Sequence, residues 1–329
     1  MLGVSGYATV KPRAAFLTFT PAHPEQIRVL ARKLRFRDLI FARQLIFSIG
    51  VVKNLPPTDR ISSLLTMVRA LGDSFSAALV ETADTNEAKP LLGFCKRFLT
   101  PFTHTLQKMG LLATERASLP RLHLLFVDSS TAYVGISYPD NGSAWFMGIP
   151  RLRFPRGAPS RSSLKLEEAW LVFLRAEEQQ QHLAPGMHAV DLGAAPGGWT
   201  WQLVNRGLRV IAVDNGSLKG NLPDSGWVEH RREDGFRYRP RKPVDWMVCD
   251  IAEQPFRIAE LMLEWFVAGW CRESIFNLKL PMKRRRDELK RCRHLIETGL
   301  ARRGIRYRLA FKQLYHDREE VTGYFRRLD

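Results

Sequence analysis

Residues 191–200 read DLGAAPGGWT, and this stretch decides how the C-terminal half of the chain is interpreted. An apolar run at 187–192 precedes it and a helix-forming run at 199–206 follows it, which predicts a strand, a turn of small residues and a helix start. Glycine and alanine let the backbone come close to a ligand, and the helix start offers free N–H groups to an anion or a carboxylate. The turn departs from the G-x-G-x-x-G pattern of dinucleotide-binding loops, and Pro196 lies inside it.

An acidic residue follows the next apolar run. Residues 210–213 are apolar and end in Asp214, where a carboxylate at the tip of a second strand can hydrogen-bond a ribose diol. The turn and the acid together indicate a nucleoside cofactor without a pyrophosphate, and S-adenosylmethionine fits that description. A NAD-dependent oxidoreductase is disfavoured by the turn, and a tight strand–helix turn that binds no ligand is the alternative.

The charge balance indicates a polyanionic partner. The chain has 329 residues, 45% of them hydrophobic, and a formal net charge of +17. This length suits two domains, and the composition suits a folded core. Residues 281–329 hold 15 Lys and Arg against 7 Asp and Glu, a net charge of +8. Such an excess is typical of nucleic-acid binding, although a merely soluble basic protein is the alternative.

The four cysteines (Cys95, Cys249, Cys271 and Cys292) show no C-x-x-C spacing, so we expect no zinc site or other metal. They suit a reducing compartment. We find no signal-peptide pattern and no apolar run long enough to cross a bilayer. These features predict a cytoplasmic protein with no membrane partner. The oligomeric state cannot be predicted from them.

The N-terminal part, residues 1–149, is predicted to be an α+β domain and not a doubly wound one. We expect helices at 24–34, 61–71 and 86–109, the last interrupted near Pro101, and a capped turn at 56–59 before the second helix. Strands are expected at 41–52, 76–82, 122–127 and 132–137. Residues 150–159 contain three prolines and three arginines and are predicted to be a linker.

Residues 160–329 alternate strands and helices, which predicts an α/β fold with a mostly parallel sheet. Strands are expected at 187–192, 208–213, 227–230, 244–249, 274–280, 305–312 and 321–325, and helices at 199–206, 254–267 and 282–304. Ligands bind at the carboxyl ends of such strands. Five residues fall at or just after predicted strand ends and should share that edge: Asp191, Asp214, Asp234, Asp250 and Lys279.

Two lysines lie where local preferences disfavour them. Lys165 falls in the first turn of a helix predicted to begin after the serines of 160–163, and a cation there opposes the helix dipole. Lys279 lies inside an apolar strand, where an ammonium group needs a partner. We expect that partner to be Asp250, one strand away; a lysine that reaches solvent is the alternative. Glu320 considered alone is an ordinary surface acid.

The residues around Asp250 bear on the type of reaction. Residues 250–255 read DIAEQP, which lacks the Asn/Asp-Pro-Pro-aromatic motif of base-amino methylases. Cys249 lies within a strand, so we expect a buried, inert thiol and no cytosine carbon-5 chemistry. Asp234 precedes Gly235 and is interpreted either as an acceptor for an adenine amino group or as a turn aspartate.

Together, Lys165, Asp250, Lys279 and Glu320 resemble the Lys-Asp-Lys-Glu tetrad of ribose 2′-O-methyltransferases. More narrowly, essentially the whole chain resembles the RlmM family of bacterial 23S rRNA cytidine 2′-O-methyltransferases. The segments that carry this resemblance are 39–44 (LIFARQ), 83–87 (ADTNE), 149–152 (IPRL), 160–162 (SRS), 192–194 (LGA), 196–200 (PGGWT), 232–236 (REDGF), 246–250 (WMVCD), 276–283 (FNLKLPMK) and 313–322 (QLYHDREEVT).

The resemblance implies a Rossmann-like S-adenosylmethionine-dependent methyltransferase domain at 160–329 and an RNA-binding THUMP domain with a ferredoxin-like part at 1–149. It implies that Lys279 accepts the proton, and its cofactor contacts correspond to Ser162, Ala195, Pro196, Gly197, Gly198, Asp214, Asp234 and Asp250. Two departures are Ala195, where many members have cysteine, and a first strand and helix that we expect to be missing before Met1.

The expected reaction is S-adenosylmethionine-dependent methylation of a cytidine 2′-oxygen in naked or partly assembled 23S rRNA. A free lysine amine keeps its proton up to about pH 10. Desolvation, Lys165 and the sulfonium charge would favour the neutral form of Lys279 that a base requires, whereas Asp250 would oppose it. Lys165 and Glu320 would orient the ribose and the base. The alternative from a different class is an RNA-binding ribosome-assembly factor with a vestigial cofactor pocket.

Overall fold

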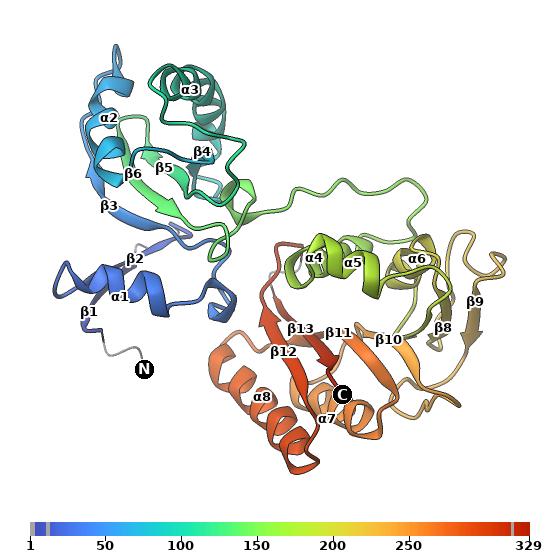
Figure 1. Ribbon diagram of the computed structural model, residues 1–329. Helices are drawn as coiled ribbons and strands as arrows, with labels where there is room; N and C mark the ends of the chain where they lie inside the picture. The colour runs from blue at the N-terminus through green and yellow to red at the C-terminus, as the bar shows by residue number, and fades with distance from the viewer. Residues whose placement is uncertain (1–3, 11–13, 317–318) are drawn as a thin grey trace. The chain divides into compact units, whose positions relative to one another are not determined.

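The computed structural model describes residues 4–10, 14–316 and 319–329, and the chain divides into two compact units, 1–150 and 151–329. Figure 1 shows the elements of each unit. None of the helices in the described residues is both long and apolar enough to cross a membrane.

The first unit is built on a four-stranded sheet with the order β3-β6-β5-β4. Strands β4 and β5 are parallel, and the other two pairings are antiparallel. Two helices, α2 and α3, pack against this sheet (Figure 1). The bounds are β3 Phe47–Val52, α2 Arg60–Leu71, β4 Ala77–Thr82, α3 Lys89–Lys108, β5 Arg121–Asp128, β6 Thr131–Ser137 and a 3-10 turn at Phe146–Gly148.

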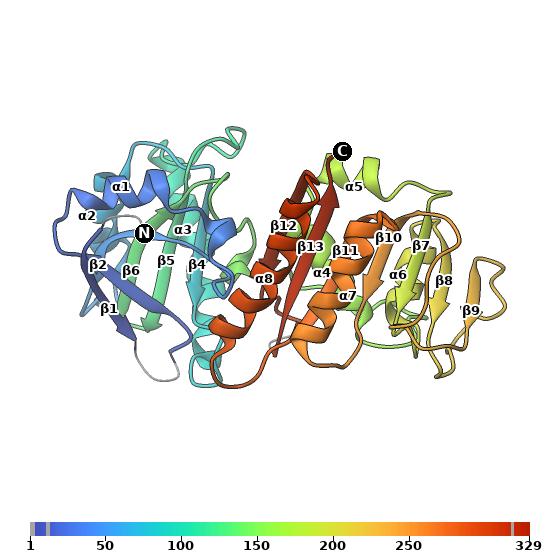
Figure 2. The same cartoon turned by 90° about the horizontal axis from the view of Figure 1, so that it is seen from below.

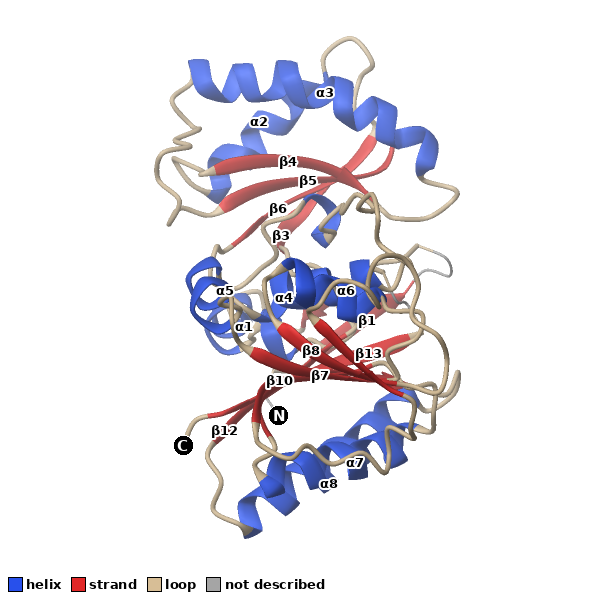
Figure 3. Cartoon of the chain, turned by 90° about the vertical axis from the view of Figure 1, so that its right-hand side faces the viewer, coloured by secondary structure: helices blue, strands red, loops and turns tan. Residues whose placement is uncertain are grey.

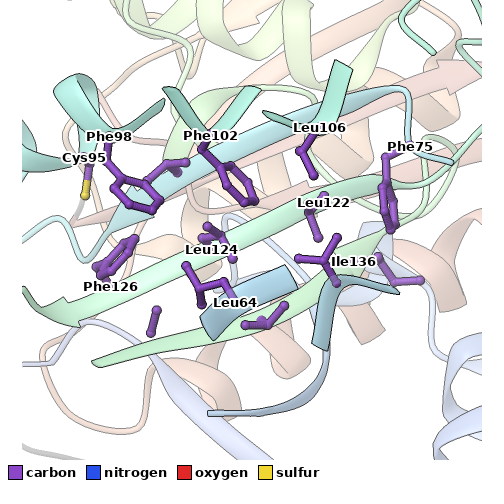
Figure 4. Packing of buried hydrophobic residues seen from close by; sticks show 14 of the residues in the cluster. Leu64, Phe75, Cys95, Phe98, Phe102, Leu106, Leu122, Leu124, Phe126 and Ile136 are labelled. Carbon is purple, nitrogen blue, oxygen red and sulfur yellow. The ribbon is translucent and has the colours of Figure 1, made fainter. Parts of the chain in front are cut away.

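The core between this sheet and its helices combines aliphatic side chains with several phenylalanines. Figure 4 shows Phe98 and Phe102 of α3 above Phe126 of β5, and the rings of Phe98 and Phe126 meet edge to face at 5.4 Å. Asp59 caps α2 by accepting a hydrogen bond from Ser62 N at 3.0 Å, which confirms the predicted cap.

Two predictions for this unit were wrong in part. The strand expected at 41–52 begins only at Phe47, because the Gln44 side chain binds the backbone of Leu45 and Ser143 in place of a strand partner. Helix α3 continues through Pro101, where an interruption was expected. Thr103, two residues after the proline, donates its hydroxyl to Leu99 O at 2.9 Å.

An antiparallel hairpin near the N-terminus was not predicted. It consists of β1 (Gly6–Val10) and β2 (Leu17–Pro21), and α1 (Gln26–Lys33) and a 3-10 turn (Phe36–Asp38) follow. All of β1 is exposed, so no alternation of buried and exposed positions marks it in the sequence.

The second unit contains a seven-stranded sheet with the order β12-β13-β11-β10-β7-β8-β9, which Figure 2 shows across the unit. Six of these strands run in one direction, and β13 runs antiparallel to both of its neighbours, β11 and β12. The strand order reverses next to β7, which is where open α/β sheets bind ligands. The strand bounds are β7 His188–Leu192, β8 Arg209–Val213, β9 Val228–Arg231, β10 Val244–Cys249, β11 Cys271–Lys279, β12 Tyr307–Lys312 and β13 Glu320–Arg327.

Helices cover both faces of this sheet, as Figure 3 shows. One face carries α4 (Ser163–Phe173), α5 (Ala176–His182) and α6 (Gly198–Asn205). The other carries α7 (Pro255–Ala268) and α8 (Arg285–Arg302). The α/β fold and every strand and helix expected after residue 186 are confirmed, with ends that differ by a few residues.

Candidate active site

The loop between β7 and α6 is shaped by glycines in close contact with other segments. Gly193 has φ +77° and faces Ile251, so a Cβ there would lie 2.7 Å from the Ile251 side chain. Gly197 has φ +110°. A Cβ on Gly198 would meet the hydroxyl oxygens of Ser160 and Ser162. Glycine therefore allows the loop to reach both the segment before α4 and the residue after Asp250.

Asp214 follows β8 and binds this loop directly. Its Oδ2 accepts a hydrogen bond from Ala195 N at 3.0 Å, and its Oδ1 accepts one from Gly216 N at 2.7 Å. The carboxylate is only partly buried, and each oxygen keeps a lone pair for a further donor. The structure therefore brings the predicted loop and the predicted acid together.

Ser162 lies at the start of α4 and also meets the loop. Its hydroxyl lies 2.5 Å from that of Ser160, and its backbone oxygen accepts a hydrogen bond from Trp199 Nε1 at 2.9 Å. The helix start predicted from these serines is confirmed, although Ser162 makes no side-chain cap bond.

Asp234 lies farther along the same sheet edge, after β9, and serves as a turn aspartate. Its Oδ1 accepts a hydrogen bond from Phe236 N at 2.9 Å, and its Oδ2 lies 3.8 Å from Arg237 Nε. The carboxylate is half exposed, with 51% of the side chain accessible.

Four charged residues meet at the ends of β10, β11 and β13. Lys165 Nζ lies 3.3 Å from Asp250 Oδ2 and 3.2 Å from Glu320 Oε2. Lys279 Nζ lies 3.4 Å from Glu320 Oε1. Glu320 therefore joins the two lysines, and its side chain is only 6% exposed. Four residues far apart in sequence thus form one cluster, and the expectation that Glu320 is a surface acid was wrong.

The expected pairing of Lys279 with Asp250 was also wrong. Lys279 lies directly opposite Glu320 in the antiparallel β11–β13 pair. In the parallel pair of β10 and β11, Cys249 lies opposite Phe276. Asp250 therefore lies two residues before the level of Lys279 along the strand direction. Among the described residues, the ion-pair partner of Asp250 is Lys165 of α4.

One residue that holds Asp250, Asn277, was missed. Asn277, fully buried in β11, donates from Nδ2 to Asp250 Oδ1 at 2.9 Å and accepts from Thr322 Oγ1 at 2.8 Å. The available signal was a buried amide in an apolar strand, since such a group needs hydrogen-bond partners.

Glu168, one turn after Lys165 on α4, was missed as well. It is 2% exposed and accepts hydrogen bonds from Tyr315 N at 2.8 Å and from His316 N at 2.9 Å. Its Oε2 also lies 2.6 Å from His316 Nδ1. Glu168 thereby anchors the segment that leads into Glu320; residues 317 and 318 of that segment lie outside the described part of the chain.

Asp191 is fully buried in β7, immediately before the loop. Thr200 donates its hydroxyl to Asp191 Oδ2 at 2.6 Å, and within the described residues Asp191 Oδ1 has no hydrogen-bond partner. Burial raises the pKa of Asp191 to about 7, and the negative charge of Asp250 adds to the rise.

We expect Asp191→Asn to become more stable relative to the wild type as the pH rises. The folded-state pKa of Asp191 lies above its ordinary value of 3.8, so the wild type has the full stabilising contribution below that value and loses it as the pH rises to about 7. Asparagine does not titrate. The measurement is the free energy of unfolding from urea titrations between pH 4 and 8, with the exposed Asp224→Asn as control. Parallel pH profiles for Asp191→Asn and the wild type would contradict the assignment.

Cys249 is fully buried at the end of β10, and burial raises the pKa of its thiol to about 12. The thiol therefore stays protonated at neutral pH, and the prediction of a buried, inert cysteine is confirmed. Within the residues that the structure describes, no group of three or more His, Cys, Asp and Glu is arranged to hold a metal ion.

The reversal of strand order beside β7, the glycine loop and the acid that binds it define a Rossmann-like domain with a candidate site for a nucleoside cofactor. A family model described as FtsJ-like methyltransferase matches residues 158–289. Two further models match the first unit: "Ribosomal RNA large subunit methyltransferase M, N-terminal" at 59–138, and "RlmM ferredoxin-like domain" at 1–46.

Curated relatives match over almost the whole chain. A protein of Methylococcus capsulatus named "Ribosomal RNA large subunit methyltransferase M" is 53% identical over 322 residues, which cover 98% of this chain and 90% of that protein. Proteins with the same name from Stutzerimonas stutzeri (52%; 100% of this chain, 93% of that one) and Cellvibrio japonicus (51%; 98% and 92%) are similar. The chain belongs to the family of ribosomal RNA large subunit methyltransferase M, which confirms the resemblance read from its motifs.

Proposed function

We propose that this protein transfers a methyl group from S-adenosylmethionine to the ribose 2′-oxygen of a cytidine in 23S rRNA, with Lys279 in its neutral form as the general base. The observation that supports this most is the joining of Lys165, Asp250, Lys279 and Glu320 at the strand ends next to the glycine loop. The names of the relatives support ribosomal RNA as the substrate class.

The residues around the loop fit S-adenosylmethionine. Asp214 has acceptor capacity for the ribose hydroxyls, and the first-turn N–H groups of α6 suit a carboxylate. We propose that Ser162, Ala195 to Gly198, Asp214, Asp234 and Asp250 hold the cofactor. Bound there, it would supply an electrophilic methyl group.

Each member of the charged cluster has a separate proposed role. Lys279, 39% exposed, is the lysine open to the substrate, and it takes the proton of the 2′-hydroxyl. Glu320 positions that amine, while Lys165, held by Asp250 and Glu320, orients the ribose. We propose that exclusion of water by bound RNA yields the neutral form of Lys279 that a base requires.

The first unit and the basic charge suit the RNA partner. The matches at 1–46 and 59–138 support an RNA-binding role for the N-terminal domain at 1–149, with 150–159 as a linker to the methyltransferase domain at 160–329. A net charge of +17 favours binding to polyanionic RNA. We propose naked or partly assembled rRNA in the cytoplasm as the target.

Cofactor binding and methyl incorporation together test this function. Calorimetry should show binding of S-adenosylmethionine, and labelled methyl should enter unmodified 23S rRNA. An RNA-binding assembly factor with a vestigial pocket would bind the rRNA without incorporating label, and that result would overturn the proposal.

Gly198→Ala is expected to weaken cofactor binding by at least about tenfold, because its methyl group would collide with the hydroxyl groups of Ser160 and Ser162. Calorimetry with S-adenosylmethionine measures the effect. Gly93→Ala is the matched control, since its methyl group would meet only the Arg97 side chain, at 3.7 Å. Equal affinities for the two variants would show that the close approach at Gly198 does not matter for the cofactor.

A further inference from the structure

A groove of about 570 Å³ adjoins Lys279, and its walls come from the segments that follow β10 and β11 and from the starts of α7 and α8. Its volume lies within the roughly 300–1,000 Å³ that ligand sites occupy. The lining residues that matter here are Glu253, Phe256, Arg257, Lys279, Glu288 and Arg291. The proposed proton acceptor therefore lines a groove that also contains two arginines and an aromatic ring.

The arginines of the groove lie against aromatic rings. The Arg291 guanidinium carbon is 3.8 Å from the centroid of the Phe256 ring, and that of Arg257 is 4.8 Å from the centroid of the Phe236 ring. Each also has an acidic neighbour on its own helix or just before it: Arg257 Nη1 lies 2.7 Å from Glu253, and Arg291 Nη1 lies 3.8 Å from Glu288. These contacts orient both guanidinium groups in advance of a ligand.

The arginines nevertheless remain open to a ligand, because 55% of the Arg257 side chain and 61% of the Arg291 side chain are exposed. Planar guanidinium groups bind phosphates through two parallel hydrogen bonds and stack on nucleobases. The phosphate nearest to a ribose 2′-oxygen is carried by the 3′-oxygen of the same ribose. An RNA chain whose 2′-oxygen faces Lys279 must therefore continue along a surface that adjoins this lysine.

We propose that this groove binds the single-stranded nucleotide on the 3′ side of the methylated ribose. Arg257 and Arg291 bind its phosphates, and its base stacks on the layer formed by Phe256 and Arg291. The inference rests on the proposed 2′-O-methylation and adds a substrate subsite to it. A base can stack there only when it is unpaired, so the subsite favours single-stranded over duplex RNA.

Equilibrium binding of the full-length protein to an unstructured oligoribonucleotide of about 15 nucleotides tests the subsite. Arg291→Ala and Phe256→Leu should each weaken binding by at least about fivefold, the loss expected when one stacked base loses its platform. Phe256→Trp keeps a ring and should bind like the wild type. Arg293→Ala is the matched control, because Arg293 carries the same charge on α8, pairs with Glu297 at 2.8 Å and does not line the groove; its effect should stay below about twofold.

Equal losses for Arg291→Ala and Arg293→Ala would show a general effect of charge and would overturn the proposal. Unchanged binding by Phe256→Leu would overturn it as well. Thermal melting and calorimetry with S-adenosylmethionine confirm that each variant is folded. RNA binding requires no methyl transfer, so the two proposals can fail separately. If the wild type methylates rRNA but all variants bind the oligoribonucleotide equally, only the subsite in the groove is excluded. If the variants differ in affinity but the wild type methylates no rRNA, the proposed reaction is excluded.

Discussion

Lys279→Ala is expected to slow methyl transfer in a single turnover by about 10²–10⁴-fold, the usual contribution of a general base. The variant loses the only group proposed to take the 2′-hydroxyl proton, while the residues proposed to hold the cofactor keep their contacts. Cofactor affinity measured by calorimetry should therefore stay unchanged. Because Lys279 is 39% exposed, its removal leaves no large cavity and the fold should persist.

Lys242→Ala is the control for this variant. Lys242 is an exposed lysine before β10, at the opposite end of the strand from Asp250. Its removal should leave the rate of methyl transfer unchanged. A Lys279→Ala protein that transferred methyl at the wild-type rate would refute the role of this amine, whatever the RNA substrate.

Lys165→Met is expected to lower the free energy of unfolding by about 3 kcal/mol, because it removes the ammonium group that pairs with Asp250 and leaves Glu320 with Lys279 alone among the cations of the described cluster. Lys165 is 18% exposed and lies between the carboxylates of Asp250 and Glu320, which are 16% and 6% exposed. Without the ammonium group the two acids repel each other. Urea denaturation measures the loss, and the rate of methyl transfer should fall with it.

Lys165→Arg separates charge from shape. It keeps the positive charge, so most of the stability should return, whereas methyl transfer should recover only in part because a guanidinium group has a different geometry. The exposed Lys242→Met is the surface control. If Lys165→Met unfolded at the same urea concentration as the wild type, the positive charge of Lys165 would not be needed to stabilise the Asp250 and Glu320 carboxylates.

Periodicity and turn residues predicted most of the second unit, but not the arrangement of its last strands. Alternation of strands and helices predicted a mostly parallel sheet, and the sheet order places Asp214 and Asp250 at one edge as expected. The position of β13 between β11 and β12 depends on pairing between distant segments. No local pattern in the sequence encodes that pairing.

The position of β13 also determines which residues meet in the candidate site. Because β13 runs beside β11, Glu320 faces Lys279 and becomes buried, although the sequence around it resembles a surface turn. Asp250 instead forms an ion pair with Lys165 and accepts a hydrogen bond from Asn277. The motif resemblance identified all four charged residues, whereas only the tertiary structure shows which acid pairs with which lysine.

The N-terminal hairpin was missed for a different reason. Strands β1 and β2 bury few side chains, so their sequences carry no alternating pattern. By contrast, β5 buries Leu122, Leu124 and Phe126 in the core of the first unit, and its apolar run was correctly predicted as a strand. A strand can thus be predicted from a single sequence when burial imposes a pattern of apolar residues on it.

The most direct test of the central claim is the chemical position of the methyl group in the product. Unmodified 23S rRNA is incubated with the protein and S-adenosylmethionine that carries a deuterated methyl group, digested to nucleosides and analysed by mass spectrometry, alongside rRNA from cells that lack the gene. We expect the deuterated methyl on the ribose of cytidine, and 2′-O-methylcytidine missing at one position in those cells. Label on a nucleobase, or no label at all, would contradict the account.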